Sequence, residues 1–300
     1  MLEQESALRT EALPSGRRVP RVTVGMPVYN GAGHVGAALQ CLLAQTFSDF
    51  SIVVSDNAST DATGVIVRDF ADRDARIRYV RQSENIGAVA NFRYVFHAAQ
   101  SEYFMWAAAD DTRSPEFLSR NVEYLDAHHD CVGSILRVRF QGRGFDPVVM
   151  GDASLEQADF ADRLAGFFGH WHANGRFYSL FRRAALARWV DENREFPGAD
   201  WTLVTHLASI GKLHRIDEGW TELGRHGASN TSDIFAPYRK SFVNWLLPFL
   251  DLTRDTQRLM RSASVGQQAR VAWRLGLLNL HAFLSQHKLM LKSRSNLWSQ

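Results

Sequence analysis

The sequence has few cysteines and no long hydrophobic run, and both absences exclude classes of protein. Cys41 and Cys131 are its only cysteines, and they form neither a CxxC motif nor a metal-binding pattern. We expect two reduced core residues, as is usual in the cytoplasm. No apolar stretch reaches the roughly 18 residues of a transmembrane helix, and the polar segment 1–18 lacks the apolar core of a secretion signal. The sequence therefore predicts a soluble, cytoplasmic protein.

A strong excess of charge is also missing. The formal net charge is only +2, so the composition does not predict a nucleic-acid-binding protein. The 45% hydrophobic and 22% charged residues are typical of a folded chain with a sizeable core. A chain of 300 residues can form one large domain or one domain with an appendage.

The glycine-rich loops of two large nucleotide-binding classes are absent as well. We predict a short buried strand at Val22–Met26 that Pro27 ends, and the turn that follows, PVYNG, has no GxGxxG fingerprint. No GxxxxGK sequence occurs either. A dinucleotide-dependent dehydrogenase or a P-loop enzyme is therefore not expected. The turn instead offers Tyr29, whose ring can lie against a base.

An acidic pair is the most informative feature that is present. The apolar run Tyr103–Ala109 predicts a buried strand, and Asp110 and Asp111 follow it directly, before a predicted helix start at Ser114–Glu116. Ligands of open α/β sheets bind beyond the carboxyl ends of the strands. Two carboxylates at that place favour a divalent cation, which commonly shares its coordination with substrate phosphates. The alternative is a polar loop in which one acid caps the next helix.

Strand and helix patterns alternate four times in the first half of the chain, with short connections. This alternation is typical of an α/β fold with a Rossmann-like, mostly parallel central sheet flanked by helices. The predicted strands lie at 22–26, 50–54, 77–80 and 103–109, and the helices at 35–45, up to about 72, and through 91–99. Later we predict a strand at 131–140, a loop at 143–154, a helix at 159–168, a strand and helix within 177–186, and two strands at 213–216 and 220–223.

Several motifs in this half resemble those of the family 2 glycosyltransferases, in the same order and spacing. They are Val24–Gly31 (VGMPVYNG), Asp56–Asp61 (DNASTD), Asn85–Gly87 (NIG) with Asn91, and Ala109–Asp111 (ADD). The resemblance covers roughly residues 20–125. It implies the GT-A fold, an inverting transfer from a nucleotide-diphosphate sugar, and Mn²⁺ or Mg²⁺ as cofactor.

The resemblance also implies roles for individual residues. Asp111 would bind the metal ion on the diphosphate, and Asp110 would lie near the ribose or the donor sugar. Many relatives have a further acid two positions before Asp111, where this chain has Ala109, so one donor contact is in doubt. The remaining residues on the nucleotide side are Pro27, Tyr29, Asn30, Asp56, Asn85 and Gly87.

The second half contains a candidate base. The segment Gly198–Leu203 resembles the part of the family that carries the catalytic acid, which makes Asp200 the base; an Asp at a helix start can also simply cap the helix. The segment after the last predicted strand resembles one that relatives place near the diphosphate, so Arg225 is expected at the donor and His226 at the metal, unless both are structural. Trp171 can stack on a sugar or pack in the core.

The C-terminal segment differs in composition. Residues 235–300 contain ten Lys or Arg against two acids, together with recurring apolar clusters. We expect two or three amphipathic helices that contact a membrane surface or, alternatively, form a helical cap or a homo-oligomer interface. The predicted division of the chain is a flexible leader at 1–20, a nucleotide-sugar-binding half at 21–125, an acceptor-binding half at 126–233 and a basic helical extension at 234–300.

These observations favour a metal-dependent hexosyl- or deoxyhexosyltransferase that adds one sugar to a glycan or lipid-linked acceptor. Surface polysaccharide biosynthesis at the inner face of the membrane is the expected setting. Polymerisation is not expected, because Ala185 replaces the Gln of the Gln-x-x-Arg-Trp motif of processive synthases before Arg188-Trp189. The alternatives are a nucleotidyltransferase, although PVYNGAG has no basic residue, and a catalytically idle glycan-binding or scaffold module.

Overall fold

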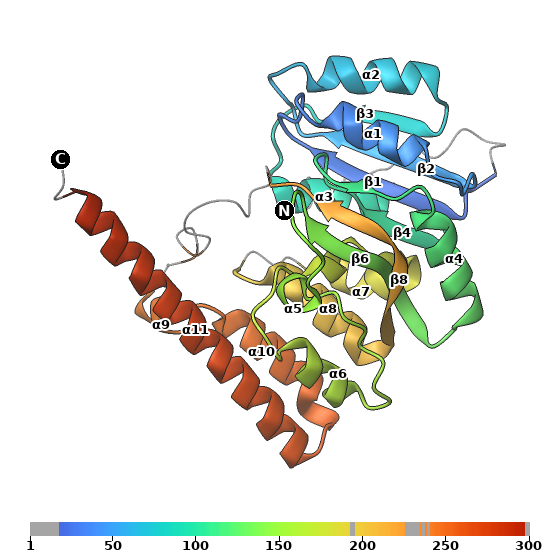
Figure 1. The fold of residues 1–300 in the computed structure, drawn as a ribbon. Coiled ribbons are helices and arrows are strands. Elements are labelled where there is room, and N and C mark those ends of the chain that lie inside the picture. Colours follow the sequence, from blue (N-terminus) through green and yellow to red (C-terminus); the bar gives the residue numbers. More distant parts are fainter. Residues whose placement is uncertain (1–17, 193–195, 226–234, 236–237, 239–240, 298–300) are drawn as a thin grey trace, which may run out of the picture.

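Four parallel strands form the first half of a central sheet in the computed structural model, which describes residues 18–192, 196–225, 235, 238 and 241–297 (Figure 1). Their order is β3-β2-β1-β4, and a helix connects each strand to the next. The elements are β1 (Val22–Val28), α1 (Val35–Leu43), β2 (Phe50–Asp56), α2 (Thr63–Arg73), β3 (Ile77–Arg81), α3 (Ala88–His97) and β4 (Tyr103–Trp106). The predicted strand–helix alternation is confirmed.

The second half of the sheet is mixed in direction. The full order is β3-β2-β1-β4-β7-β6-β8-β5, in which β7 is antiparallel to β4 and β6, β8 is parallel to β6, and β5 is antiparallel to β8. The elements are β5 (Thr112–Arg113), α4 (Phe117–Ala127), β6 (Cys131–Phe140), α5 (Pro147–Met150), α6 (Phe160–Phe167), η2 (Gly175–Tyr178), β7 (Leu180–Arg182), α7 (Arg183–Val190), α8 (Ala199–Ile210) and β8 (Lys212–Leu223). The α/β class is confirmed.

The structure corrects several predicted boundaries. Pro27 does not end the first strand; it lies within β1, opposite Ser55 of β2. Its missing N–H faces the β4 side, where the ladder has already ended at Gly25 and Trp106, so no sheet hydrogen bond is lost. The two strands predicted at 213–216 and 220–223 are one strand, β8, with an irregular register opposite Leu136–Val138. The predicted loop 143–154 contains the short helix α5, and β5 precedes α4.

The sheet separates two hydrophobic cores, and β4 shows how. Tyr103 and Met105 face the core beneath α1, α2 and α4, whereas Phe104 and Trp106 face the core formed with α3, α7 and α8. All four residues are fully or almost fully buried. Because successive residues of a strand point to opposite faces, a continuous apolar run is what a strand covered on both sides requires.

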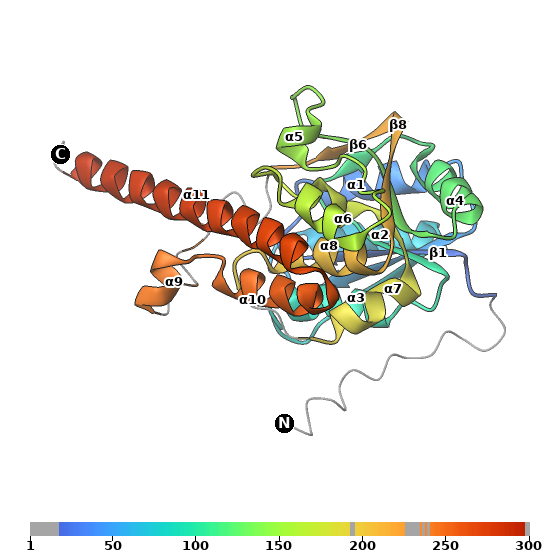
Figure 2. The ribbon, with the colours of Figure 1, turned by 90° about the horizontal axis from the view of Figure 1, so that it is seen from below.

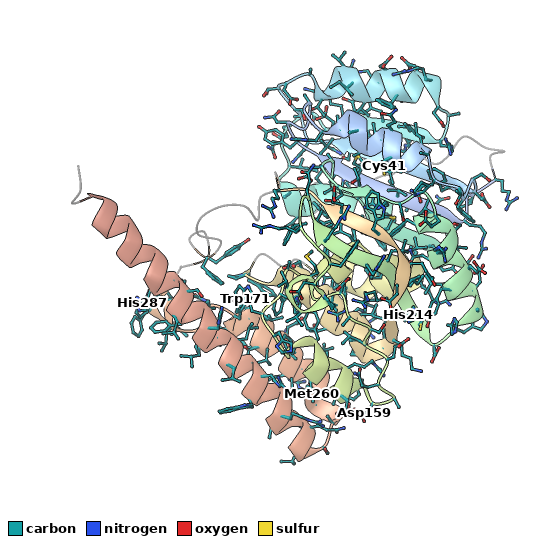
Figure 3. The ribbon with its side chains drawn as sticks, viewed as in Figure 1. Cys41, Asp159, Trp171, His214, Met260 and His287 are labelled. Carbon is teal, nitrogen blue, oxygen red and sulfur yellow. The ribbon has the colours of Figure 1, made fainter. Side chains whose placement is uncertain are left out.

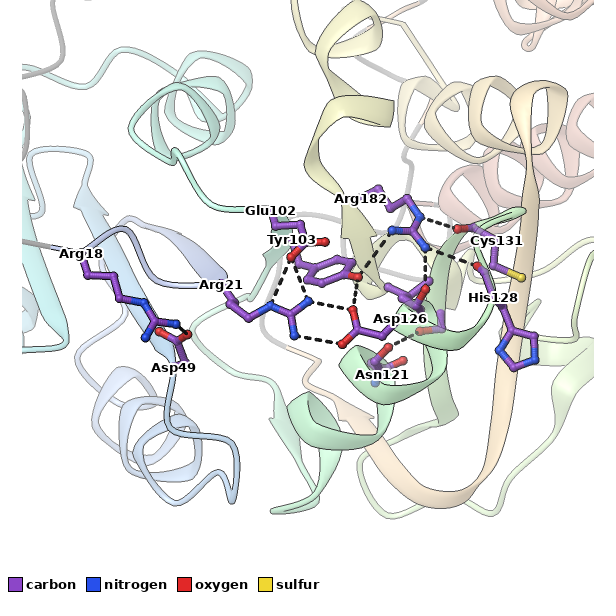
Figure 4. A network of polar contacts seen from close by, with 12 residues as sticks. Arg18, Arg21, Asp49, Glu102, Tyr103, Asn121, Asp126, His128, Cys131 and Arg182 are labelled. Atoms are coloured by element: carbon purple, nitrogen blue, oxygen red, sulfur yellow. Dashed lines mark hydrogen bonds and ion pairs between the residues drawn. The ribbon is translucent and has the colours of Figure 1, made fainter.

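A polar network ties the strands together at the sheet edge where β1 and β4 begin (Figure 4). Arg21, just before β1, pairs with Glu102 (2.8 Å) and with Asp126 of α4 (2.7 Å). The Tyr103 hydroxyl donates to Asp126 (2.7 Å), and Arg182 of β7 donates to the carbonyl of Cys131 (2.9 Å). The network therefore joins the two halves of the sheet at the end opposite the loops that follow β1 to β4.

The C-terminal segment forms a helical extension beside the α/β domain (Figure 2). Its elements are α9 (Phe242–Leu246), α10 (Leu250–Leu259), η5 (Met260–Ser262) and α11 (Val265–Leu297). α10 packs on α8 and α11 packs on α6. Asn279 of α11 accepts the Phe249 N–H (2.9 Å) and donates to Thr253 Oγ1 (3.1 Å), which fixes the two helices to each other. Within the described residues, no helix is long and apolar enough to cross a membrane.

Candidate active site

The loops after β1 and β2 are joined by hydrogen bonds at the carboxyl edge of the sheet. Asn30, whose φ of 51° is tolerated better by Asn than by most residues, donates its N–H to Ser59 Oγ (2.9 Å). Its Oδ1 accepts the Thr60 N–H (2.8 Å). Pro27 is buried below this loop, and Tyr29 is 50% exposed. The structure thus places Pro27, Tyr29 and Asn30 together, with the Tyr29 ring accessible.

Asp56 is the completely buried last residue of β2. Its Oδ1 accepts the Ser59 N–H (2.8 Å), and its Oδ2 accepts the Tyr79 hydroxyl (2.8 Å) and Arg81 Nη1 (2.7 Å). Burial acts to raise the pKa of Asp56, but these hydrogen bonds and the charge of Arg81 outweigh it and keep the pKa below its usual value. Asp56 is therefore an ionised anchor that holds the partly exposed Arg81 at the sheet edge.

Asn85 and Gly87 belong to the loop after β3, and Asn57 fixes this loop beside the β2 loop. Asn57 Nδ2 donates to Asn85 Oδ1 (2.8 Å), and Asn57 Oδ1 accepts the Ile86 N–H (2.9 Å). Gly87 has a φ of 83° at the start of α3, a conformation that suits glycine. Asn85 and Gly87 are exposed. The hydrogen bonds of Asn57 bring their loop to the same sheet edge as Tyr29 and Asp56.

The acidic pair follows β4 and meets the end of β8. Asp111 is only 3% exposed, and its Oδ1 accepts the Gly224 N–H (3.0 Å). Its Oδ2 is buried and has no hydrogen-bond partner within the described part of the chain. A Cβ atom at Gly224 would collide with the Asp110 carboxylate, so only glycine lets the β8 end approach this closely. The pair and the segment Gly224–Arg225 are thus in contact across 113 residues of sequence.

Burial dominates the titration of Asp111 and raises its pKa to about 6. The charge of the buried Arg113 and the hydrogen bond from Gly224 act in the opposite direction, and Asp110 adds to the increase. Because the folded-state pKa is higher than that of the unfolded chain, the ionised carboxylate of Asp111 lowers the folding stability as the pH rises through about 6. A buried acid with this cost is more often functional than structural.

Asp200 lies in the first turn of α8, which starts after Gly198 (φ 79°). A Cβ at Gly198 would approach Phe249, so glycine also permits the contact with the C-terminal extension. Asn174 Nδ2 donates to Asp200 Oδ2 (2.9 Å) and to its backbone carbonyl (3.0 Å). Part of the Asp200 side chain reaches solvent. Desolvation by the neighbouring elements nevertheless raises the pKa of its carboxyl group, and the hydrogen bond from Asn174 opposes this increase.

A buried histidine holds Asn174 in place. The Asn174 N–H donates to His172 Nδ1 (3.0 Å), so Nε2 carries the proton and donates to the Phe167 carbonyl (3.1 Å). Burial lowers the pKa of His172 to about 4, which keeps the ring neutral. The ring also stacks on Trp201, with centroids 4.3 Å apart. Asn174 itself has a φ of 53° and is almost fully buried. Its side chain therefore reaches Asp200 from a fixed backbone.

The charges of the acidic pair and of Asp200 all act on Tyr178, the last residue of η2. Burial raises the pKa of the Tyr178 hydroxyl, and the charges of Asp111, Asp110 and Asp200 raise it further. Carboxylates from two distant segments therefore influence the same hydroxyl. Tyr178 and Asn174 were not predicted from the sequence, and no local signal distinguishes Tyr178 from Phe177 beside it.

The donor set at this point suits a hard divalent cation shared with phosphates. Among the residues that the structure describes, no group of three or more His, Cys, Asp or Glu side chains is placed to hold a metal ion. Mg²⁺ and Mn²⁺ sites on nucleotides often need only one or two carboxylates, because phosphates and waters supply the other ligands. The unpartnered Oδ2 of Asp111 fits that requirement. Arg225 lies next to Gly224 over the Phe140 ring (5.7 Å), and His226 lies outside the described residues.

Comparisons with known proteins agree with this arrangement. The sequence model described as "Glycosyl transferase family 2" matches residues 23–189, which is more than half of the chain. An uncharacterized glycosyltransferase of Haemophilus influenzae is 26% identical over 227 residues, which are 72% of this chain and 68% of the relative. Other curated relatives match over shorter stretches, in which the chain spans about a third of their length.

Two solved structures share the fold. The crystal structure of S. aureus TarS 1–349 in complex with UDP-GlcNAc superposes with a TM-score of 0.61 at 16% identity, covering 84% of this chain and 70% of TarS 1–349. The mannosyltransferase PcManGT from Pyrobaculum calidifontis, in complex with GDP-Man and Mn²⁺, has a TM-score of 0.57 at 17% identity and covers 98% of this chain and 81% of its own. At sequence identities this low, the two structures support the fold of this chain and nothing further.

The Asn174–Asp200 contact has a measurable consequence. Replacing Asn174 by Gly keeps the positive φ accessible but removes the amide that stabilises the Asp200 carboxylate, so the pKa of Asp200 is expected to rise. A carbon-13 NMR titration of the Asp carboxyl groups measures this. Asp61, whose hydrogen bonds come from Thr63 and Ala32, serves as the internal control and should titrate unchanged. An unchanged or lower pKa of Asp200 would show that Asn174 does not support the carboxylate.

Proposed function

This chain belongs to the family 2 glycosyltransferases, and from that premise we propose that it moves one sugar from a nucleotide-diphosphate sugar to an acceptor hydroxyl with inversion at the anomeric carbon. The observation that carries the proposal is the buried Asp111 carboxylate at the carboxyl edge of the sheet, whose Oδ2 has no hydrogen-bond partner within the described residues. TarS and PcManGT, which share the fold, are in complex with UDP-GlcNAc and GDP-Man, both of which are nucleotide sugars. Family membership also disfavours the nucleotidyltransferase alternative.

The nucleoside of the donor binds at the loops after β1, β2 and β3 in this proposal. Tyr29 supplies an exposed ring for the base, and Asn85 and Gly87 supply polar backbone and side-chain groups beside it. Asp56 contributes from beneath, since it fixes Ser59 and Arg81 through its carboxylate. These residues come from three adjacent strand ends, where open α/β sheets bind their ligands.

The diphosphate and a divalent cation bind at the acidic pair. We assign Asp111 as the protein ligand of Mn²⁺ or Mg²⁺, because its Oδ2 is buried without a partner in the described structure. When bound, the cation stabilises the negative charge that develops on the leaving diphosphate. Asp110 faces the ribose or the donor sugar, and Arg225, next to Gly224, provides a positive charge at the same end of the sheet. His226 remains a proposed second metal ligand.

Asp200 is the general base of the transfer. As the acceptor oxygen forms its bond to the anomeric carbon, its proton moves to the Asp200 carboxylate, and the bond from that carbon to the diphosphate oxygen breaks. The nucleoside diphosphate leaves from the opposite face, which gives inversion. Desolvation by the surrounding elements raises the pKa of Asp200, and this makes the carboxylate a stronger base than an aspartate with the usual pKa. Asn174 holds Oδ2 of Asp200, which orients the carboxylate for the acceptor in this proposal.

The donor sugar is proposed to be a hexose or deoxyhexose, and the acceptor a glycan or a lipid-linked glycan in surface polysaccharide biosynthesis at the cytoplasmic side of the membrane. Trp171 offers an aromatic surface near the acceptor side. It is partly exposed and packs against Trp201, the neighbour of Asp200, with ring centroids 6.1 Å apart (Figure 3). We therefore assign Trp171 two roles: its ring packs against the core, and its exposed part stacks on a sugar of the acceptor.

Two substitutions separate donor binding from catalysis. Asp111→Asn is expected to abolish Mn²⁺-dependent binding of the nucleoside diphosphate, because the amide cannot replace the anionic ligand. Asp200→Asn is expected to leave that binding intact and to slow release of the diphosphate from the donor by about 10²–10⁴-fold, the usual contribution of a general base. Calorimetry measures the binding, and a coupled assay with UDP-GlcNAc and GDP-Man measures the release. Unchanged Mn²⁺-dependent affinity in Asp111→Asn, or a normal rate in Asp200→Asn, would remove that residue from its role.

A third substitution tests the contact between β8 and the acidic pair. In Gly224→Ala the new methyl group collides with the Asp110 carboxylate and shifts the N–H that binds Asp111. Loss of one hydrogen bond to a charged group should weaken Mn²⁺-dependent nucleotide binding by about tenfold or more. Gly266→Ala in α11 is the matched control, because a Cβ there meets nothing within 4 Å and the residue lies outside the strand-end loops. Equal affinities of the two variants would contradict the proposed metal and diphosphate position.

A further inference from the structure

The long helix α11 has an apolar face that the catalytic domain does not cover. One side of the helix is buried on the domain through Val271, Leu275, Leu278 and Ala282. The opposite side exposes Trp273 (68%), Leu277, Leu280 and Leu284, of which each leucine is about half exposed. The spacing of three and four residues places these four side chains on one stripe. A soluble helix normally presents polar groups at such positions, so this stripe needs an occupant.

The short helix α9 extends the apolar surface. Its Trp245 packs on Phe283 and His287 of α11, with ring centroids 5.0 Å apart in both contacts, so α9 lies directly beside α11 (Figure 3). Phe242 is 72% exposed, and Val243, Leu246 and Leu247 are also exposed. The described part of the extension therefore exposes nine large apolar side chains on two neighbouring helices: Val265, Trp273, Leu277, Leu280 and Leu284 on α11, and Phe242, Val243, Leu246 and Leu247 on or just after α9.

Arginines of α10 and of the following turn η5 lie next to this surface. α10 buries Leu252 and Thr256, and the spacing of Arg254, Arg258 and Arg261 (the last in η5) places the arginines on the opposite side, where they line a shallow hollow. Arg254 and Arg258 also pair with Asp251 (3.3 Å) and Asp255 (3.6 Å). α10 and α11 both turn their buried sides to the catalytic domain and pack against each other, so their other sides face away from it (Figure 2). An arginine stripe and an apolar stripe thus lie on adjacent, outward-facing helices.

We propose that this outward surface of the extension docks the protein on an anionic lipid bilayer. Trp273, Leu277, Leu280 and Leu284 enter the boundary between headgroups and acyl chains, and the arginines of α10 contact the phosphate headgroups. An apolar face combined with a basic one is the usual composition of a helix that lies in the membrane interface. Stable attachment generally takes two signals, and here apolar side chains and basic side chains supply one each.

Charge argues for lipid rather than for a second copy of the chain. The sequence of α11 contains five Lys or Arg and no Asp or Glu, so a second α11 would bring only like charges to the stripe. The segment 235–300 as a whole has ten Lys or Arg against two acids, so an anionic surface complements its net charge.

Docking in this way would orient the active site. His281 of α11 contacts Trp171 (ring centroids 5.1 Å apart), and Trp171 contacts Trp201, the neighbour of the proposed base Asp200. The side of the enzyme that holds Asp200 therefore lies near the docked helix, where a lipid-linked acceptor would be within reach. The docking itself does not depend on the chemistry proposed for the site.

The test is sedimentation of the full-length protein with vesicles at low salt. Vesicles of phosphatidylcholine are compared with vesicles of an equal mixture of phosphatidylcholine and phosphatidylglycerol. The unmodified protein is expected to sediment with the anionic vesicles and to be released as salt screens the arginines. In Leu280→Gln/Leu284→Gln, partition should fall by about tenfold or more, since two half-exposed leucines no longer leave water on docking.

Matched variants separate the surface from general effects. Val65→Gln/Ile210→Gln alters two equally exposed apolar residues on α2 and α8 and should bind vesicles like the unmodified protein. Arg254→Gln/Arg258→Gln should weaken binding to anionic vesicles, whereas Arg18→Gln/Arg73→Gln, at exposed sites elsewhere, should not. Nucleotide binding without vesicles should be the same in all variants, so failure of docking is distinguishable from failure of the proposed enzyme activity.

Three results would overturn the proposal. One is the absence of sedimentation with anionic vesicles at low salt. Another is equal binding of the Leu280/Leu284 variant and the Val65/Ile210 control. The third is a dimer in analytical ultracentrifugation that the Leu280/Leu284 substitutions dissociate while vesicles bind neither form, which would assign the stripe to a second copy of the chain.

Discussion

The buried carboxylate of Asp111 is the constraint on which the site depends. It is 3% exposed, receives one hydrogen bond from the Gly224 N–H, and has Arg113 as its nearby cation, and its pKa is nevertheless raised to about 6. An ionised acid in this position is costly for folding and becomes favourable when a cation binds it. The surroundings of this carboxylate depend on the close approach of β8, on the mixed second half of the sheet and on the position of Tyr178.

Much of the fold was predictable because its first half is local in sequence. β1, β2 and β4 are largely apolar and buried, β3 is a short edge strand with apolar residues at Ile77, Tyr79 and Val80, and each strand ends at a polar loop. The alternating pattern therefore predicts both the strands and the edge where Tyr29, Asp56 and Asp111 gather. The strand at Cys131–Phe140 was predicted to the residue for the same reason. The roles that the family resemblance assigns to the individual site residues remain predictions.

The rest of the site depends on contacts between distant segments, which no local pattern encodes. Gly224 must be glycine because Asp110 lies against it, and Asn174 matters because α8 brings Asp200 to its amide. The strand β8 was predicted as two strands, because Asp217, Glu218 and Gly219 interrupt the apolar pattern where the register of the pair with β6 changes. Pro27 was expected to end β1, but its nitrogen faces a gap in the ladder rather than a hydrogen-bond partner.

The central claim is that Asp111 and the strand-end loops form a metal-dependent site for a nucleoside diphosphate. Calorimetric titration of the protein with UDP, GDP, dTDP and CDP, each with and without Mn²⁺, tests it most directly. The expected result is binding of one of the four that requires Mn²⁺, which would also identify the donor base. Binding of none of them under either condition would contradict the claim and favour a catalytically idle module with this fold.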